Sequence, residues 1–226
     1  MKTLLTVLLF LAMTFSAIAQ QPDSTYIEKG KFTVGLDVSF IPFHIYYKEP
    51  KGSGAIRSGY FVPISLTAGY QLSRRANVRV GLGFGGDKDE GDYTVQDVKY
   101  EVASKTFAIA GSVSFSHIFF NLYRKFPIYG TLSVIPAYGI TKGKMVATNA
   151  EGSSTLTTRD TGMDVFATAG VGFNYKISKR FYGDASYYFY KRNLTGRNSF
   201  DHDWESYAPL PRRIFKSLEF GVNYKL

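Results

Sequence analysis

Few residues in this sequence combine the types and the spacing that chemistry requires. Ser116 and His117 are its only neighbouring serine–histidine pair, a combination that could supply a nucleophile and its base. Adjacent strand residues point to opposite faces, however, so these two side chains would not meet if the segment is a strand. No carboxylate is evidently placed to orient the imidazole either. We therefore expect no catalytic residues, although a lipid-modifying enzyme remains an alternative to a non-enzymatic surface protein and to a narrow pore.

Three other motifs resemble binding sites. The glycines of "GLGFGG" (Gly81, Gly83 and Gly86) match a phosphate-binding pattern, but the following "DKDEGD" opens no helix, so we expect a strand with small residues. "DHDW" at 201–204 offers one histidine and two carboxylates, which is a weak metal cluster. Asn193 begins an N-x-T sequon, to which we assign no role. We expect no cofactor and no metal.

The beginning of the chain has the layout of an export signal. Lys2 precedes an apolar run over residues 4–13, and small residues end at Ala19. This pattern predicts a signal peptide over 1–19 with cleavage after Ala19. The sequence contains no cysteine, so an exported chain would have to be stabilised without disulfides.

Composition narrows the class of protein further. The 226 residues carry a net charge of +9 and include 19 Phe, 17 Tyr and 22 Gly, which argues against a helical bundle. After the signal, no segment approaches the roughly 18 consecutive apolar residues of a membrane helix. Basic charge with many aromatic residues could suit nucleic acid, but an exported chain seldom meets any, so we expect no nucleic-acid partner.

Alternation of apolar and polar residues recurs along the chain. In "KFTVGLDVSF", for example, Phe32, Leu36 and Phe40 share one face with the valines between them. Such alternation predicts β-strands, and the segment lengths suit a membrane barrel. About eight segments show it, an even number as single-chain barrels require. They are 31–40, 62–72, 77–85, 106–115, 128–140 (interrupted by Pro136), 163–177, 181–190 and 216–226.

The connections between these segments alternate in length. Short basic turns, "LSRR", "LYRK" and "ISKR", recur at intervals of about 50 residues and form a weak internal repeat. The other connections are long and polar, and they cover 48–59, 85–101, 141–162 and 191–213. Short turns at one rim and long loops at the other are typical of an outer-membrane barrel, with the turns periplasmic and the loops extracellular.

The two faces of the predicted strands differ in a way that decides which face meets lipid. A soluble barrel or sandwich would bury the apolar face. Here the second face carries many glycines and the charges Asp37, Arg79, Asp184 and Glu219, which cannot fill a dry core. We therefore expect the apolar face to meet lipid and these four residues to form a charge network in a narrow lumen. Arg79 should bond at least one of the carboxylates.

The last strand carries the features on which a family resemblance rests. In "KSLEFGVNYKL", Gly221, Tyr224 and Leu226 resemble the C-terminal assembly signal of outer-membrane barrels, although such proteins more often end in Phe. The chain from 31 to 226, after a short lead-in over 20–30, resembles the small outer-membrane β-barrel domain family, the OmpA/OmpX-like barrels of Gram-negative envelopes. The expected fold is an all-β, antiparallel transmembrane barrel of about eight strands.

The resemblance implies a location more firmly than an activity. We expect the cell outer membrane, with membrane lipid and the barrel-assembly machinery, engaged through the C-terminal strand, as partners. The preferred function is non-enzymatic, either structural or binding an envelope or surface partner through the loops. The first alternative is a porin-like narrow pore for small solutes, which an eight-stranded interior disfavours because side chains fill it. The second is a lipid-modifying outer-membrane enzyme.

Overall fold

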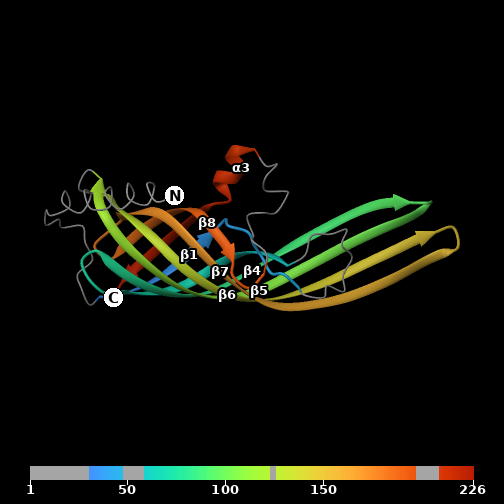
Figure 1. The fold of residues 1–226 in the computed structure, drawn as a ribbon, viewed down its shortest axis with the longest axis horizontal. Helices are drawn as coiled ribbons and strands as arrows, with labels where there is room; N and C mark the ends of the chain where they lie inside the picture. Colours follow the sequence, from blue (N-terminus) through green and yellow to red (C-terminus); the bar gives the residue numbers. More distant parts are fainter. Residues whose placement is uncertain (1–30, 48–58, 123–125, 197–208) are drawn as a thin grey trace, which may run out of the picture.

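The computed structural model describes residues 31–47, 59–122, 126–196 and 209–226. Within these ranges the chain is almost entirely antiparallel β-structure (Figure 1). The expected signal peptide and lead-in lie outside the described residues. Eight long strands form the wall: β1 (Phe32–Ser39), β3 (Tyr60–Gln71), β4 (Ala76–Val95), β5 (Val98–Leu122), β6 (Phe126–Asn149), β7 (Gly152–Lys176), β8 (Phe181–Asn193) and β9 (Leu218–Lys225).

The wall closes on itself, so the expected antiparallel barrel is confirmed. The strand order runs from β1 through β9, β8, β7, β6, β5 and β4 to β3, and β3 pairs again with β1. At the β1–β9 seam, Val34 lies opposite Tyr224, and Leu226 N donates a hydrogen bond to Phe32 O over 3.0 Å. Within the described ranges, no helix has the length and apolar character needed to cross a bilayer.

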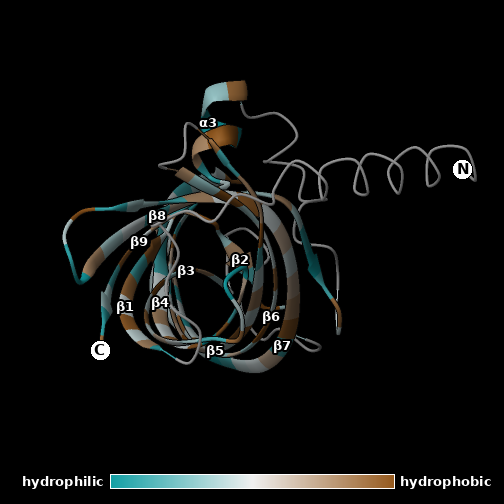
Figure 2. Ribbon diagram, turned by 90° about the vertical axis from the view of Figure 1, so that its left-hand side faces the viewer, coloured by the Kyte–Doolittle hydropathy of each residue, from teal (hydrophilic) through white to brown (hydrophobic). Residues whose placement is uncertain are grey.

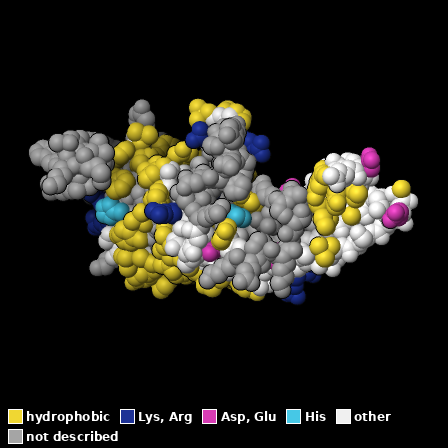
Figure 3. Space-filling model, turned by 45° about the vertical axis from the view of Figure 1, so that its right-hand side comes forward, with side chains coloured by type: hydrophobic (Ala, Val, Ile, Leu, Met, Phe, Trp, Pro, Cys, Tyr) yellow, Lys and Arg dark blue, Asp and Glu magenta, His cyan; other side chains and the backbone are white. Residues whose placement is uncertain are grey.

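The outer face of the ring is apolar, as the alternation predicts. Leu66, Val80 and Leu132 are exposed there, and apolar side chains gather over the barrel (Figure 3). Strand β6 runs through Pro136 without losing this parity. Near the short turns, aromatic rings pair on the outer face, for example Phe32 with Tyr70 and Phe181 with Tyr224. Such an aromatic girdle is typical of a membrane interface.

Two of the expected long polar connections are strands rather than loops. Strands β4 and β5 pair as far as Val95 and Val98, and β6 and β7 pair as far as Asn149 and Gly152. Both residues of the β4–β5 turn, Gln96 and Asp97, have positive φ (49° and 63°), as a tight two-residue hairpin requires. The two hairpins also pair with each other, so β4–β7 project beyond the ring as one sheet (Figure 1).

Two short elements complete the described structure. Strand β2 (Phe43–His44) pairs with the start of β3 and lies inside the ring, as the end-on view shows (Figure 2). Helix α3 (Leu210–Phe215) lies outside it and precedes β9. Pro209 is its N-cap residue, and all six of its residues are exposed. Most of the expected connections 48–59 and 191–213 lie outside the described residues.

Candidate functional site

The lumen is crossed by an ion-pair cluster near the β1–β9 seam. Arg79 of β4 approaches Asp37 of β1, with Nη1 3.1 Å from Oδ2. Its Nη2 lies 3.6 Å from Oδ1 of Asp184 on β8. The carboxylate side chains are almost fully buried, at 7% and 2% exposed, so water screens the three charges poorly. A buried cation between two carboxylates compensates charges that would be costly alone.

Gly221 of β9 makes room for this cluster. It lies opposite Asp37 on one side and Asp184 on the other. A Cβ at Gly221 would collide with a carboxylate oxygen of each. The amide of Asn223 donates a hydrogen bond to Asp184 Oδ1. Gly221, which the sequence predicts to be part of an assembly signal, is thus also restricted to glycine by the two neighbouring carboxylates.

Glu219, the fourth residue of the expected network, has a different partner. It lies opposite Ser39 at the seam, further along the lumen from the short turns than Gly221. Its Oε1 accepts a hydrogen bond from the hydroxyl of Tyr188 over 3.0 Å. The structure therefore brings Arg79, Asp37 and Asp184 into direct contact, whereas Glu219 is held by a phenol.

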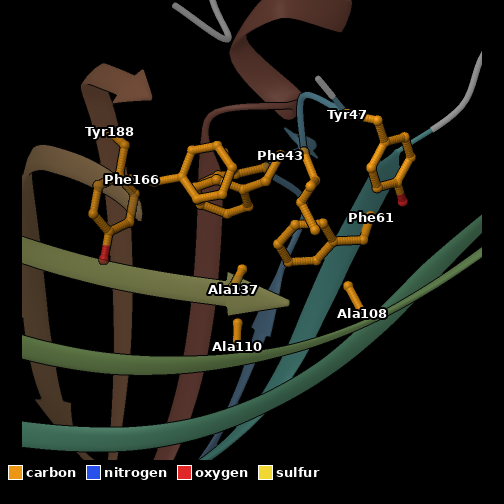
Figure 4. Close-up of a cluster of buried hydrophobic side chains, with 10 residues drawn as sticks. Phe43, Tyr47, Phe61, Ala108, Ala110, Ala137, Phe166 and Tyr188 are labelled. Carbon is orange, nitrogen blue, oxygen red and sulfur yellow. The ribbon is translucent and has the colours of Figure 1, made fainter. Parts of the chain in front are cut away.

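Beyond this polar layer, an apolar segment fills the lumen. After β1, the alternation continues, but the inward residues change from polar to apolar at Ile41, Phe43, Ile45 and Tyr47. We call residues 40–47 the plug. Its inward side chains pack with Phe61, Phe166 and Tyr188 over small wall residues, Ala108, Ala110 and Ala137 (Figure 4). The plug was not predicted from the sequence, although the alternation in "FIPFHIYY" indicates it.

Hydrogen bonds fix the plug to several strands of the wall. The ammonium of Lys191 donates to Pro42 O and lies 5.6 Å from the centre of the Phe43 ring. Tyr46 N donates to Asp164 Oδ2 over 2.6 Å. Lys191 belongs to β8 and Asp164 to β7, so the plug is held on the side of the ring opposite the start of β3.

A β-bulge places Lys191 in the lumen. Tyr190 lies opposite Ala169 and Tyr188 opposite Gly170, so one residue of β8 is extra. Simple alternation would put Lys191 on the lipid face with Tyr187. The bulge reverses the parity, and Lys191 is only 1% exposed. Two adjacent exposed aromatic residues, Phe189 and Tyr190, are the sequence signal of this bulge.

Two small cavities flank Arg79 in the lumen. One is lined by Asp37, Phe43 and Glu219, and the other, towards the short turns, by Gln71, Asn77 and Asn223.
Each offers about 60 Å³. Pockets that bind small organic ligands are usually about 300–1,000 Å³. Among the described residues, the space beside Arg79 therefore has room for a few water molecules and not for a solute of ordinary size.

The serine–histidine pair does not form a catalytic unit. Ser116 faces the lumen, where its hydroxyl donates to Thr131 Oγ1 over 3.2 Å. His117 is exposed on the outer face, and its ring centre lies 6.0 Å from that of Phe119. The opposite orientations follow from strand geometry, as expected.

The remaining motifs either form part of the barrel wall or lie outside the described residues. "GLGFGG" belongs to β4, and Gly81 and Gly83 face serines of neighbouring strands. Asn193 is buried and donates to Asp164 Oδ2 over 2.7 Å. "DHDW" lies outside the described residues. Among those that are described, no group of three or more His, Asp or Glu is arranged to hold a metal.

The other two residues of the expected assembly signal lie at the end of β9. The Tyr224 ring centre is 5.1 Å from that of Phe181, and its hydroxyl accepts a bond from Arg180 Nη1 over 2.9 Å. Leu226 is exposed, and its backbone joins β1. Both residues thus strengthen the edge that closes the ring.

A closed ring with an apolar outer face and a polar or self-filled interior agrees with the match to a family model. The outer membrane protein beta-barrel domain model matches residues 5–207. The chain belongs to this family. Membership of this family places the chain in the outer membrane.

Two solved bacterial structures are similar to this member of the outer membrane beta-barrel family. Ail, the attachment invasion locus protein of Yersinia pestis, is 12% identical, and the match covers 88% of this chain and 99% of Ail with a TM-score of 0.31. CarO2 of Acinetobacter baumannii is 11% identical, with 87% and 99% covered and a TM-score of 0.33. No match is found among curated proteins.

Proposed function

We propose that this protein is a non-enzymatic surface barrel whose projecting β4–β7 sheet binds an extended segment of a partner protein along β7. The main support for this proposal is that one edge of β7 is open in the projecting sheet. Strand β8 pairs with β7 only from Phe166 onward, so residues 152–159 of β7 pair with β6 on one side and, among the described strands, with none on the other. Unpaired strand edges are templates for strand addition.

The two edges of the projecting sheet differ in a way that favours β7. Strand β3 pairs with β4 only as far as Gly86, and the β4 residues beyond it, "DKDEGDYTV", are rich in charge, which protects an edge from strand addition. On β7, Ser153 to Thr158 are six uncharged residues rich in Thr, and Leu156 is exposed. Such residues suit a pleated surface and leave the edge open.

The filled lumen supports this proposal over solute transport. The plug and the Arg79 cluster occupy successive layers, and the two cavities beside Arg79 are small. Catalysis lacks support because Ser116 and His117 face opposite ways. A closed barrel that carries a long projecting sheet suits a binding or structural role.

Site-specific photo-cross-linking in intact cells tests the proposal. A photoreactive amino acid is placed at Ser154, Leu156 or Thr158 on the β7 edge, and at Asp87, Asp89 or Asp92 on the β4 edge as matched controls. We expect a discrete cross-linked product from the β7 positions alone. Equal products from both edges, or none from β7, would contradict strand addition there. Unchanged lipid A mass spectra in a deletion strain would separately argue against the enzyme.

A further inference from the structure

A row of cations crosses the projecting sheet on its outer face. Lys88 lies opposite Lys105, Lys105 opposite Lys142, and Lys142 opposite Arg159, so four neighbouring strands each contribute one positive charge at the same rung. We call these four residues the basic row. Like charges directly opposite each other destabilise a sheet. The arrangement is therefore costly unless an anion compensates it.

The basic row borders a shallow groove that adds a fifth cation. The groove offers about 530 Å³ and is lined by all four residues of the row and by Lys144. Ala103, which shares the outer face with the row, has a short side chain and leaves space between the neighbouring lysines. No carboxylate lines it. Among the described residues, Lys88 alone of the five has an ion-pair partner, Glu90, over 2.7 Å.

The position of the basic row relative to the apolar outer face of the ring, which we call the apolar belt, indicates where its ligand lies. On the outer face, the rung nearer the ring contains Phe107 opposite Ile140, and the next one contains Ile109 opposite Tyr138. The cations thus follow directly after the lipid-facing residues, at the extracellular rim. Carboxylates come further out: Glu90 lies one rung beyond the row, and Asp92 and Glu101 lie opposite each other two rungs beyond it. Phosphate groups of membrane lipids occupy this boundary, where each nearby cation strengthens attraction to an anionic surface.

We propose that the basic row binds the phosphate groups of a phosphorylated glycolipid in the outer leaflet of the outer membrane. The apolar belt beneath the row contacts the acyl chains of the same lipid. The lysine ammonium groups bind phosphate as point charges, and the planar guanidinium of arginine binds two phosphate oxygens at once. In the groove, the oxygens of one phosphate group can contact cations from more than one strand. This site lies on the outer face and does not require the β7 edge to bind a partner.

Lipid binding by the purified full-length protein in detergent micelles tests this assignment. Native mass spectrometry compares diphosphoryl lipid A with the same lipid lacking both phosphates. The test variant is K105Q/K142Q/R159Q, and the control is R74Q/K176Q/K179Q, which removes three exposed cations at the opposite rim. Each cation near an anionic surface contributes about fivefold, so we expect about 100-fold weaker binding of the diphosphoryl form by the test variant and little change in the control.

Other outcomes decide against the assignment. Equal binding of both lipids by the wild type, or equal loss in the test and control variants, would overturn it. Inorganic pyrophosphate is the soluble comparison, and if it displaces the lipid from the row at equal concentration, the ligand is a free phosphate and not a lipid. Unheated gel mobility checks that the variants fold. If the triple variant does not, the single change Lys142→Gln should still weaken binding about fivefold, and an unchanged affinity would refute the site.

Discussion

Arg79 and Asp184 lie on diametrically opposite strands of the ring, yet Arg79 Nη2 and Asp184 Oδ1 are only 3.6 Å apart. Three strands separate β4 from β8 in either direction. The arginine side chain therefore crosses the lumen and connects walls that share no backbone hydrogen bond. Because Asp37 belongs to β1, the same guanidinium also supports the seam.

Replacing Arg79 with alanine should destabilise the barrel. The change leaves Asp37 and Asp184 buried without their cation, and removing one partner of a buried ion pair costs about 3–5 kcal/mol. Urea unfolding in detergent micelles, followed by the mobility difference between folded and unfolded protein, measures the loss. Arg74→Ala, in an exposed turn, is the control and should have little effect. Equal unfolding midpoints for the two variants would contradict the role of Arg79.

The lumen should conduct only when both of its obstructions are removed. Wild-type protein in planar bilayers should give no stable large conductance, and Arg79→Ala alone should give none because the plug remains. Adding Ile41→Ser, Phe43→Ser and Ile45→Ser removes the apolar packing of the plug, and this combined variant should show channel steps. Reproducible large steps from wild-type protein would instead favour transport, and a silent combined variant would mean that other residues close the lumen.

Lys191 should matter more than its neighbour Arg192. Lys191→Ala removes the donor to Pro42 O and the cation over Phe43, and an unsatisfied buried acceptor costs about 1–3 kcal/mol. Arg192 is exposed, so Arg192→Ala should change the free energy of unfolding little. Urea unfolding of both variants measures the difference. A larger loss in Arg192→Ala would show that the bulge does not fix the plug in this way.

Removing the end of β9 should impair assembly more than shortening a hairpin. Deleting 224–226 removes pairing with β1 and the proposed assembly signal. Deleting 147–154 removes only the β6–β7 turn and the paired residues beside it, including the first part of the segment from Glu151 to Arg159 that was expected to be a loop. An exposed seam cannot be satisfied in lipid. The fraction that migrates as folded barrel before heating measures assembly. Similar fractions for the two deletions would refute the importance of the terminus.

The regular alternation of inward and outward side chains allowed the wall of the barrel to be predicted from the sequence. Where this alternation is interrupted, the residues that fill the interior could not be predicted. Residues such as Asp37 and Arg79 follow the two-residue period of uninterrupted strands, so their inward orientation could be inferred. Lys191 could not be placed in the same way, because the bulge near Phe189 shifts the period by one residue. The contact between Arg79 and Asp184 also depends on ring closure, which no local pattern specifies.

The plug and the hairpins show two other limits of sequence patterns. The segment from Ile41 to Tyr47 alternates like a strand, but its inward path depends on pockets formed by distant residues such as Phe166. The hairpin segments are mostly polar, and their apolar alternation is short, as in Val98, Tyr100 and Val102, so they resemble loops. Backbone pairing with neighbouring strands, for example Lys99 opposite Thr148, defines them instead.

The length of the paired hairpins sets how far the protein reaches from the membrane. From the rung of Gly86 and Phe107 to the turn between Val95 and Val98, β4 and β5 add nine residues each, or about 30 Å along the strand at about 3.3 Å per residue. A sheet of four paired strands is stiffer than a loop of the same length. The acidic tips are therefore held at a set distance from the cell surface, and an approaching molecule meets them before it meets the lipid.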